Sequence, residues 1–285
     1  MILVAGGTGR LGSQVVAALL ARGQEVRVLA RGARPAPPEV ADAETLAGSL
    51  LDEDAVDRAM SGVDTVVSAV TGFPFSSPAR VDAAGNQVLV RAAERAGAEV
   101  VLVSVAGASP GSRMGLFRAK HEAEQALARA DARGTVIRPE AFADLWIELL
   151  TTTATRSHRP LVFGRGDNPI GWVAVRDVAA LVVRGVEEQA LRGATLTISG
   201  PERMTLRDLA DRVMATHGWA GAPRHVPPPA LRVASLLPGR AGRQAEAALT
   251  MDETPAAADD ARCRVPGLPV TPVAELLAQR VAHHD

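Results

Sequence analysis

The most constraining feature of this chain is a glycine-rich turn between its first apolar run and its first helical pattern. Residues 2–5 are apolar, and residues 11–20 carry Leu and Val at helical spacing. Between them the chain reads Gly6-Gly7-Thr8-Gly9-Arg10-Leu11-Gly12. Glycines at this spacing let the chain turn tightly, let the backbone approach a pyrophosphate and let the helix pack close to the sheet. The phosphate would lie on the unpaired amides at the helix start. The pattern predicts a dinucleotide-binding unit, and a turn without ligand is the alternative.

The end of the second predicted strand, residues 25–30, offers an arginine where NAD-binding sites usually offer an acid. An acid there binds the ribose hydroxyls, whereas Arg31 can bind a 2′-phosphate with two hydrogen bonds. Arg34 follows three residues later, and Arg10 in the glycine turn could lie over the same phosphate. We therefore expect the cofactor to be NADP, with NADPH preferred over NADH. Solvated surface arginines are the alternative, more so for Arg34 than for Arg31.

Apolar runs and helical patterns alternate through the first half of the chain, which is typical of a parallel sheet covered by helices. We expect an α/β fold, a doubly wound parallel Rossmann sheet with a small C-terminal substrate lobe. The core is predicted over 1–138 and 172–200, and the lobe over 139–171 and 201–285. Asp177 is the expected N-cap of a helix over 178–187. The stretch 238–272 is expected to be rich in loops.

Composition excludes several classes of function. The 285 residues carry 31 basic and 32 acidic side chains, so a net charge of −1 provides no field for collecting nucleic acid or an anionic membrane. No uncharged run is long enough to span a bilayer, and no basic leader precedes the first strand. We therefore expect a cytoplasmic protein without a signal peptide. The single cysteine, Cys263, excludes an internal disulfide and a cysteine-based metal cluster, and the histidines show no metal-ligand spacing.

Two residue counts bear on the chemistry. There is no tyrosine, so no phenolic acid can take part in a reaction. There is one lysine, Lys120, in a chain whose other long basic side chains are all arginine. A genome rich in GC codons would replace lysine by arginine at indifferent sites, so the position of the surviving lysine is informative.

Several motifs together carry a family resemblance. They are Gly6-Gly7-Thr8-Gly9, Leu29-Ala30-Arg31, Asn86, Lys120, Arg138-Pro139 and the stretch 163–178. On these motifs the chain resembles the atypical short-chain dehydrogenase/reductases, and within them it is most similar to the NmrA-like and NAD(P)H-quinone-reductase-like branch. The resemblance covers residues 1–218. It implies a Rossmann sheet with NAD(P)H bound across the strand ends.

The resemblance also implies which residues form the site. For the cofactor these are Gly6, Thr8, Gly9, Arg10, Leu11, Gly12, Arg31, Ser68, Ala69, Val70 and Lys120. The catalytic candidates are Lys120, which matches the lysine of the family's active-site helix, and Ser104, at the end of the fifth strand. The superfamily often places a tyrosine four residues before the lysine, and this chain has Leu116 there. The structural alternatives are local capping by Ser104 and an ion pair between Lys120 and Glu124, one helical turn later.

Large apolar side chains gather near the predicted strand ends. The candidate substrate-pocket residues are Phe73, Met114, Phe117, Phe142 and Trp146. Taken singly, each is more typical of a core, but their clustering favours an apolar ligand site. The segments 73–78 and 223–243 are expected to cover the substrate, because they follow strands and are rich in Gly and Pro.

These features favour an NADPH-dependent oxidoreductase that transfers hydride to a hydrophobic carbonyl, enone or quinone. One alternative is an NADP(H)-binding sensor that acts through a partner protein without turnover. Another is a redox-neutral biosynthetic enzyme on the same fold. In the leading interpretation the partner is a hydrophobic small molecule, and neither nucleic acid nor membrane is expected to bind.

Overall fold

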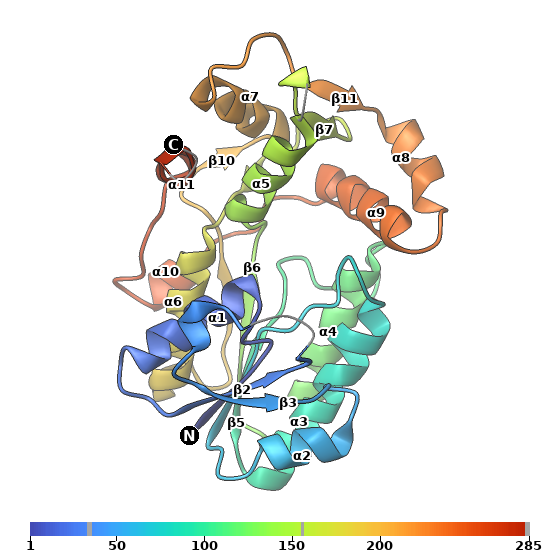
Figure 1. The fold of residues 1–285 in the computed structure, drawn as a ribbon. Helices are drawn as coiled ribbons and strands as arrows, with labels where there is room; N and C mark the ends of the chain where they lie inside the picture. Colours follow the sequence, from blue (N-terminus) through green and yellow to red (C-terminus); the bar gives the residue numbers. More distant parts are fainter. Residues whose placement is uncertain (33–35, 155–156, 283–285) are drawn as a thin grey trace.

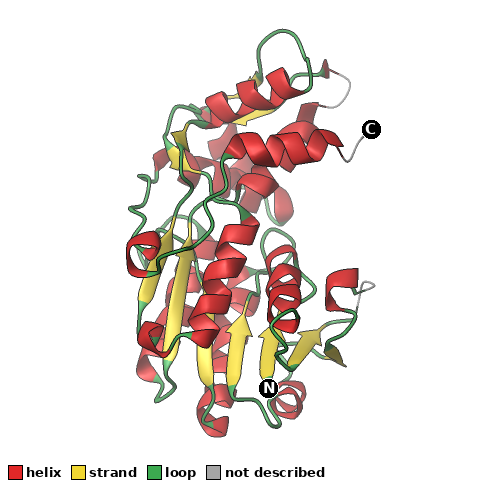
Figure 2. Ribbon diagram, turned by 90° about the vertical axis from the view of Figure 1, so that its left-hand side faces the viewer, coloured by secondary structure: helices red, strands yellow, loops and turns green. Residues whose placement is uncertain are grey.

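A seven-stranded parallel sheet forms the centre of the computed structural model, which describes residues 1–32, 36–154 and 157–282 (Figures 1 and 2). In spatial order its strands are β3 (Glu44–Ala47), β2 (Val26–Ala30), β1 (Ile2–Ala5), β4 (Thr65–Ser68), β5 (Glu99–Val103), β6 (Gly134–Pro139) and β9 (Thr195–Ile198). Every neighbouring pair is parallel. The inner strands read as continuous apolar runs because both faces of the sheet are covered.

Helices cover the sheet on both faces, as the alternating sequence pattern predicts. One face buries α1 (Arg10–Leu20) and α6 (Val175–Glu187). The other face buries α2 (Glu53–Ala59), α3 (Asn86–Ala96) and α4 (Gly115–Arg129). Alternate residues of β5 point to opposite faces, so Val101 and Val103 join the first cluster while Val100 and Leu102 join the second. The predicted doubly wound Rossmann fold is confirmed.

The strand order reverses beside β1, and this reversal locates a ligand site. From β1 the chain passes to β2 and β3 on one side, and it then crosses to β4, β5 and β6 on the other. In open parallel sheets, ligands bind beyond the carboxyl ends of the strands at such a reversal. Here that position is occupied by the glycine turn after β1 and by residues 69–72 after β4.

Above the strand ends lies a second group of elements, which we call the lobe (Figure 1). Its helices are α5 (Ala143–Ala154), α7 (Leu206–Thr216), α8 (Pro228–Ser235), α9 (Arg240–Glu253) and α11 (Val273–Ala282). Its short strands pair as β7 (Leu161–Phe163) with β11 (Arg224–Val226) and β8 (Ile170–Gly171) with β10 (Arg203–Met204). Its main apolar cluster surrounds Trp172 and includes Ile147, Leu209 and Leu277.

Several predicted elements differ from the structure. The prediction of loops over 238–272 is wrong, because α9 and the short helix α10 (Ala261–Arg264) lie there. The residues before α3 form a π-helix, η2 (Ala79–Gly85), and two 3₁₀ turns are η1 (Pro38–Val40) and η4 (Gln189–Leu191). The predicted core and lobe boundaries stay a prediction, although α10 falls in the predicted lobe range and packs against the core through Ala261.

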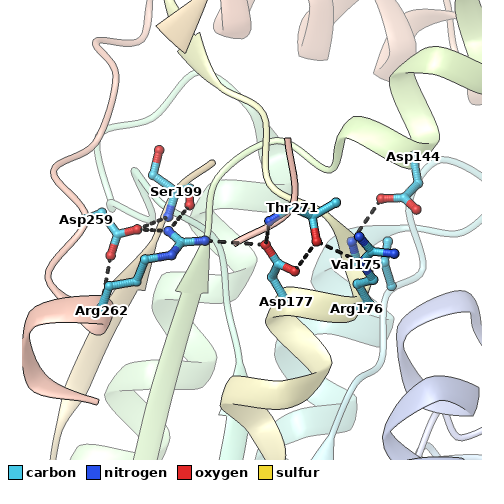
Figure 3. A network of polar contacts seen from close by, with 8 residues as sticks. All are labelled: Asp144, Val175, Arg176, Asp177, Ser199, Asp259, Arg262 and Thr271. Carbon is cyan, nitrogen blue, oxygen red and sulfur yellow. Dashed lines mark hydrogen bonds and ion pairs between the residues drawn. The ribbon is translucent and has the colours of Figure 1, made fainter. Parts of the chain in front are cut away.

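Asp177 does not cap α6. The helix begins two residues earlier, and the amide of Val175 donates instead to Oδ2 of Asp144, at the start of α5 (2.9 Å). Asp177 lies inside the first turn, fully buried, where its carboxylate accepts hydrogen bonds from the amide (2.9 Å) and hydroxyl (2.6 Å) of Thr271. Figure 3 shows these bonds beside a second group, in which Arg262 pairs with Asp259 and reaches Asp177. The network joins α5, α6 and the C-terminal segment.

Candidate functional site

The glycine turn is shaped by contacts that leave no room for side chains. Gly6 has a φ of +80°, and a Cβ there would come within 2.8 Å of the Ala69 carbonyl oxygen. A Cβ on Gly12 would overlap the carbonyl oxygen of Gly6. These close approaches bring the turn against the residues that follow β4. The predicted cofactor residues Gly6, Gly9, Gly12 and Ala69 are therefore neighbours.

The first turn of α1 presents amides that have no partner within the helix. Its N-cap, Gly9, has no side chain to bond them, and the first turn carries no acidic residue. Thr8 precedes this N-cap, and Arg10 and Leu11 begin the helix. A helix start of this kind suits an anionic phosphate, both through its amides and through the positive end of the helix dipole.

Arg10 does not point freely into solvent. Its Nη2 pairs at 2.6 Å with Oε2 of Glu148 on α5, so this ion pair links the glycine turn to the lobe. Burial acts to raise the pKa of the Glu148 carboxyl, but the hydrogen bonds and charges of Arg10 and Arg280 together outweigh burial and hold that pKa below its ordinary value. Binding of Arg10 to a 2′-phosphate stays a prediction.

Arg31 follows β2 and is exposed. It lies at the carboxyl end of the strand next to β1, on the side where a 2′-phosphate would be read. Arg34 lies outside the described residues.

Lys120 is buried beneath the ends of two strands. Its Nζ donates hydrogen bonds to the carbonyl oxygens of Val70 (2.7 Å), after β4, and Val103 (3.0 Å), at the end of β5. It also forms an ion pair at 3.3 Å with Oδ1 of Asp82, a fully buried residue of η2. The lysine therefore connects the predicted cofactor residue Val70 with β5 and the π-helix.

The alternative pairing of Lys120 with Glu124 is wrong. Glu124 binds Arg138 instead, with Nε at 2.9 Å and Nη2 at 2.5 Å from its two carboxylate oxygens. The hydrogen bond to Glu124 raises the pKa of the Arg138 guanidinium, against the opposing effect of burial. A planar guanidinium matches both oxygens of a carboxylate, which a lysine ammonium cannot do.

Ser104 directly follows β5 on the same edge of the sheet. Its hydroxyl is buried, and it has no hydrogen-bond partner within the part of the chain that the structure describes. An unpaired buried hydroxyl costs free energy unless another group binds it. The predicted alternative, in which this serine caps local backbone, has no support among these contacts.

The structure places the five predicted pocket residues on different elements, and a shared substrate pocket stays a prediction. Met114 and Phe117 are buried at the start of α4, where the Phe117 ring lies beside Gly107. Phe142 packs against the α1–α6 cluster. Trp146 contacts Trp172 edge to face and lines a small apolar pocket inside the lobe, with Phe163, Ile170 and Met251 among its neighbours. Phe73 is half-buried in the loop after β4.

The two segments predicted to cover the substrate meet each other. Arg243 on α9 donates to the carbonyl oxygen of Pro74 at 2.9 Å, and the Arg240 guanidinium lies 4.6 Å from the centre of the Phe75 ring. The N-terminal end of α9 thus rests on the loop that follows β4. Figure 1 shows α9 above the start of α4.

Sequence reasoning missed Asp82 as a partner of the lysine. The available signal was an isolated acid in an otherwise apolar stretch, Val81-Asp82-Ala83-Ala84, just before Gly85. An acid in such a stretch is usually either exposed or paired. Its partner could not be identified, because Lys120 belongs to a different helix.

Comparison with known proteins supports the family read from the motifs. The model of a family described as NAD(P)H-binding matches residues 6–189. The chain belongs to this NAD(P)H-binding family. The predicted membership in the atypical short-chain dehydrogenase/reductases, NmrA-like branch, is confirmed, and so is an NAD(P)H cofactor.

Among related sequences, a (4-alkanoyl-5-oxo-2,5-dihydrofuran-3-yl)methyl phosphate reductase from Streptomyces griseus is 32% identical over 73% of this chain and 71% of its own length. An NAD(P)H azoreductase from Xenophilus azovorans is 27% identical over 76% of this chain and 74% of its own. The chain thus belongs with NAD(P)H-dependent oxidoreductases.

Solved structures show the same fold over the whole chain. An NADPH-dependent quinone oxidoreductase from Escherichia coli, in complex with NADPH, is similar with a TM-score of 0.82 and 22% identity, over 99% of this chain and all of that one. A triphenylmethane reductase from Citrobacter sp. has a TM-score of 0.79 and 18% identity, over 98% of this chain and 99% of its own. No helix in the described ranges could cross a membrane.

Proposed function

We propose that this chain is an NADPH-dependent reductase that transfers hydride to a hydrophobic acceptor, such as a quinone, a conjugated enone or another carbonyl compound. The observation that carries the proposal is the glycine turn at the reversal of strand order. On the same edge of the sheet lies the buried hydroxyl of Ser104, which has no partner among the described residues. Two related proteins are named reductases, and one of them is named for NAD(P)H.

The residues present fit a dinucleotide. In the proposed site, Gly6, Gly9 and Gly12 allow close approach of the pyrophosphate, and the amides at the start of α1, around Thr8, Arg10 and Leu11, bind it. Arg31 binds the 2′-phosphate and sets the preference for NADPH. Ser68, Ala69 and Val70 line the nicotinamide half.

When bound, NADPH supplies the hydride, so the residues of the chain have to orient the acceptor and stabilise the negative charge that develops on it. In the proposed reaction Ser104 donates a hydrogen bond to the acceptor oxygen, which is supported by the absence of another partner for its hydroxyl among the described residues. The sequence contains no tyrosine, so a phenolic proton donor is absent. A quinone or conjugated enone yields a stabilised anion and needs little acid, whereas a simple ketone yields a basic alkoxide.

The test is NADPH oxidation with a panel of quinones, conjugated enones and unactivated aliphatic ketones of matched size. We expect the activated acceptors to be reduced faster than any aliphatic ketone. Faster reduction of the aliphatic ketones would contradict the proposed chemistry. Tight NADPH binding without turnover of any acceptor would favour the sensor alternative.

A further inference from the structure

The lysine of the candidate site is bound within a buried polar chain that runs across five elements. Ser68 at the end of β4 donates to the side-chain oxygen of Asn86 on α3. The Asn86 amide nitrogen donates to the Asp82 backbone carbonyl at 2.7 Å, and the amide of Gly72 donates to Oδ2 of Asp82 at 2.9 Å. The other carboxylate oxygen of Asp82 faces Lys120. Ser68, Asp82 and Asn86 are all fully buried.

The π-helix explains why Asp82 reaches this position. Residues Ala79–Gly85 form η2 directly before α3, and η2 packs closely on α4, which carries Lys120. A π-helical turn is wider than an α-helical turn and leaves carbonyls for other donors. The Asn86 side chain binds one such carbonyl, that of Asp82. The local backbone is therefore arranged around the carboxylate.

The surroundings of Lys120 occupy its ammonium group. Two of its N–H groups bind backbone carbonyls, and its remaining neighbour is a carboxylate with no solvent exposure. An ammonium has three N–H groups, so the two carbonyl oxygens and the carboxylate oxygen around Nζ leave none of them for an acceptor. A residue held in this way is poorly suited to deliver a proton in each turnover.

We infer that Lys120 and Asp82 are positioning residues, a buried ion pair that fixes the ends of β4 and β5, and that Lys120 is not the proton donor of the reaction. The pair holds the Val70 carbonyl and the Gly72 amide in place on one strand end and the Val103 carbonyl on the next. It therefore sets the position of Ser68, Ala69 and Val70, against which the nicotinamide half is proposed to bind, and of Ser104.

This inference rests on the proposed function and narrows its substrate class. With no tyrosine and with Lys120 held by Asp82, the hydroxyl of Ser104 is the proposed donor to the acceptor, and an alcohol is a weak acid. The site then suits acceptors whose reduced form leaves as a stabilised anion and takes its proton from water. Quinones and conjugated enones meet this condition.

The experiment uses three test variants, namely Asp82→Asn, Lys120→Met and the double variant that combines these two substitutions. Glu124→Gln is the control. The control removes a different buried carboxylate, that of Glu124 on α4, which binds Arg138 of β6 and, within the described residues, has no hydrogen bond to the ends of β4 and β5. For each protein we would measure the NADPH dissociation constant without acceptor, kcat and its pH dependence with a quinone, and thermal unfolding.

We expect each single substitution to weaken NADPH binding by about tenfold, because the strand ends shift. The kcat at saturating NADPH should fall by no more than about tenfold, because Ser104 moves with the strand end, and its pH dependence should keep its shape, since no catalytic proton is lost. The double variant should bind NADPH at least as tightly as the single variant with the lower NADPH affinity, because it leaves no charge buried without a partner. Glu124→Gln should bind NADPH as wild type does.

A roughly 100-fold loss of kcat in Lys120→Met with unchanged NADPH affinity would overturn the inference, because a lost general acid has this effect. A shift of the pH profile in Asp82→Asn would overturn it as well. If a single variant fails to fold, the NADPH affinity and kcat of the double variant test the inference instead, because removing both charges keeps the buried site neutral. If the wild type reduces no acceptor, the proposed function fails, while the NADPH titrations still test the positioning role.

Discussion

The two sides of the candidate site are built in opposite ways. The strand-end edge is made by residues 6–12, 68–72 and 103–104. Close glycine contacts fix its turn, and hydrogen bonds from Lys120 and to Asp82 fix Val70, Gly72 and Val103. The α8–α9 pair above it buries little, and it exposes Leu236 (83%) and Val233 (70%) to solvent. Structure held by few buried contacts opens at low free-energy cost, whereas a closely packed network does not. This difference agrees with the proposed roles, in which the edge binds one invariant cofactor and the α8–α9 pair covers the acceptor.

The strongest test of this difference between the two sides is to add one carbon atom to the glycine turn of the strand-end edge. Gly12→Ala places a methyl group against the Gly6 carbonyl, so the turn has to move, and we expect NADPH affinity to fall by about 100-fold. Fluorescence titration measures the change. In the control, Gly185→Ala on α6, the added carbon makes an ordinary 3.4 Å contact with Val101 and should leave affinity unchanged. Wild-type affinity in Gly12→Ala would show that the turn does not hold the cofactor.

A second substitution tests the exposed rim of the same edge. Arg31→Ala should remove about 1.5–3 kcal/mol of binding free energy toward NADPH, the usual value for a charged hydrogen bond. NADH has no 2′-phosphate, so its affinity should not change. Titration of both cofactors into both proteins checks the prediction. Equal affinities for NADPH and NADH in the wild type would refute the role assigned to Arg31.

On the α8–α9 side, Arg243→Ala removes the hydrogen bond to the Pro74 carbonyl and frees the end of α9. We expect the KM for the acceptor to rise by about two- to tenfold, with the NADPH dissociation constant unchanged. Arg232→Ala, an exposed arginine on α8, is the matched control. A change in NADPH affinity without a change in KM would show that the two sides are not separate in function.

The smallest expected effect lies far from the site, at the capping box of α7. The hydrogen bonds from Thr205 hold the pKa of Asp208 below its ordinary value. Because this pKa is lower in the folded chain, the carboxylate stabilises the fold above its ordinary titration range, and the contribution is lost as the pH falls through the folded pKa. Asp208→Asn should lower the free energy of unfolding by about 0.5 kcal/mol at neutral pH.

Denaturant unfolding at neutral and acidic pH measures this difference, which should shrink in acid. Asp211→Asn, exposed on the same helix, is the control. Equal losses in both variants would mean that the capping box does not stabilise α7. NADPH binding should be the same in both.

The contrast between the two sides also explains what could be predicted from sequence. The strands and the glycine turn are predictable because buried parallel strands are continuous apolar runs and because the turn needs glycine at fixed positions. Helices α8 and α9 were missed because neither is buried on a wide face. Prolines 228 and 229 also read as loop, although the first turn of a helix tolerates them.

The polar pairings were harder to predict than the elements. Spacing along one helix suggests Lys120 with Glu124, but the structure pairs Lys120 with Asp82 and Glu124 with Arg138. Both true partners lie on other elements, brought close only by the tertiary fold. A local rule for helical pairs cannot anticipate competitors of this kind.

The path of the chain between core and lobe restricts how this protein can acquire new specificities. The chain leaves the sheet after β6, returns as α6, leaves again after β9, returns at α10 and leaves once more near Thr271 (Figure 1). The network of Figure 3 takes residues from each of these passages, including Asp144, Asp177, Ser199 and Arg262. A lobe threaded in this way cannot be exchanged between relatives as one cassette. New substrate preference has to arise by substitution in place, and the exposed side chains of α8 can change without disturbing this junction.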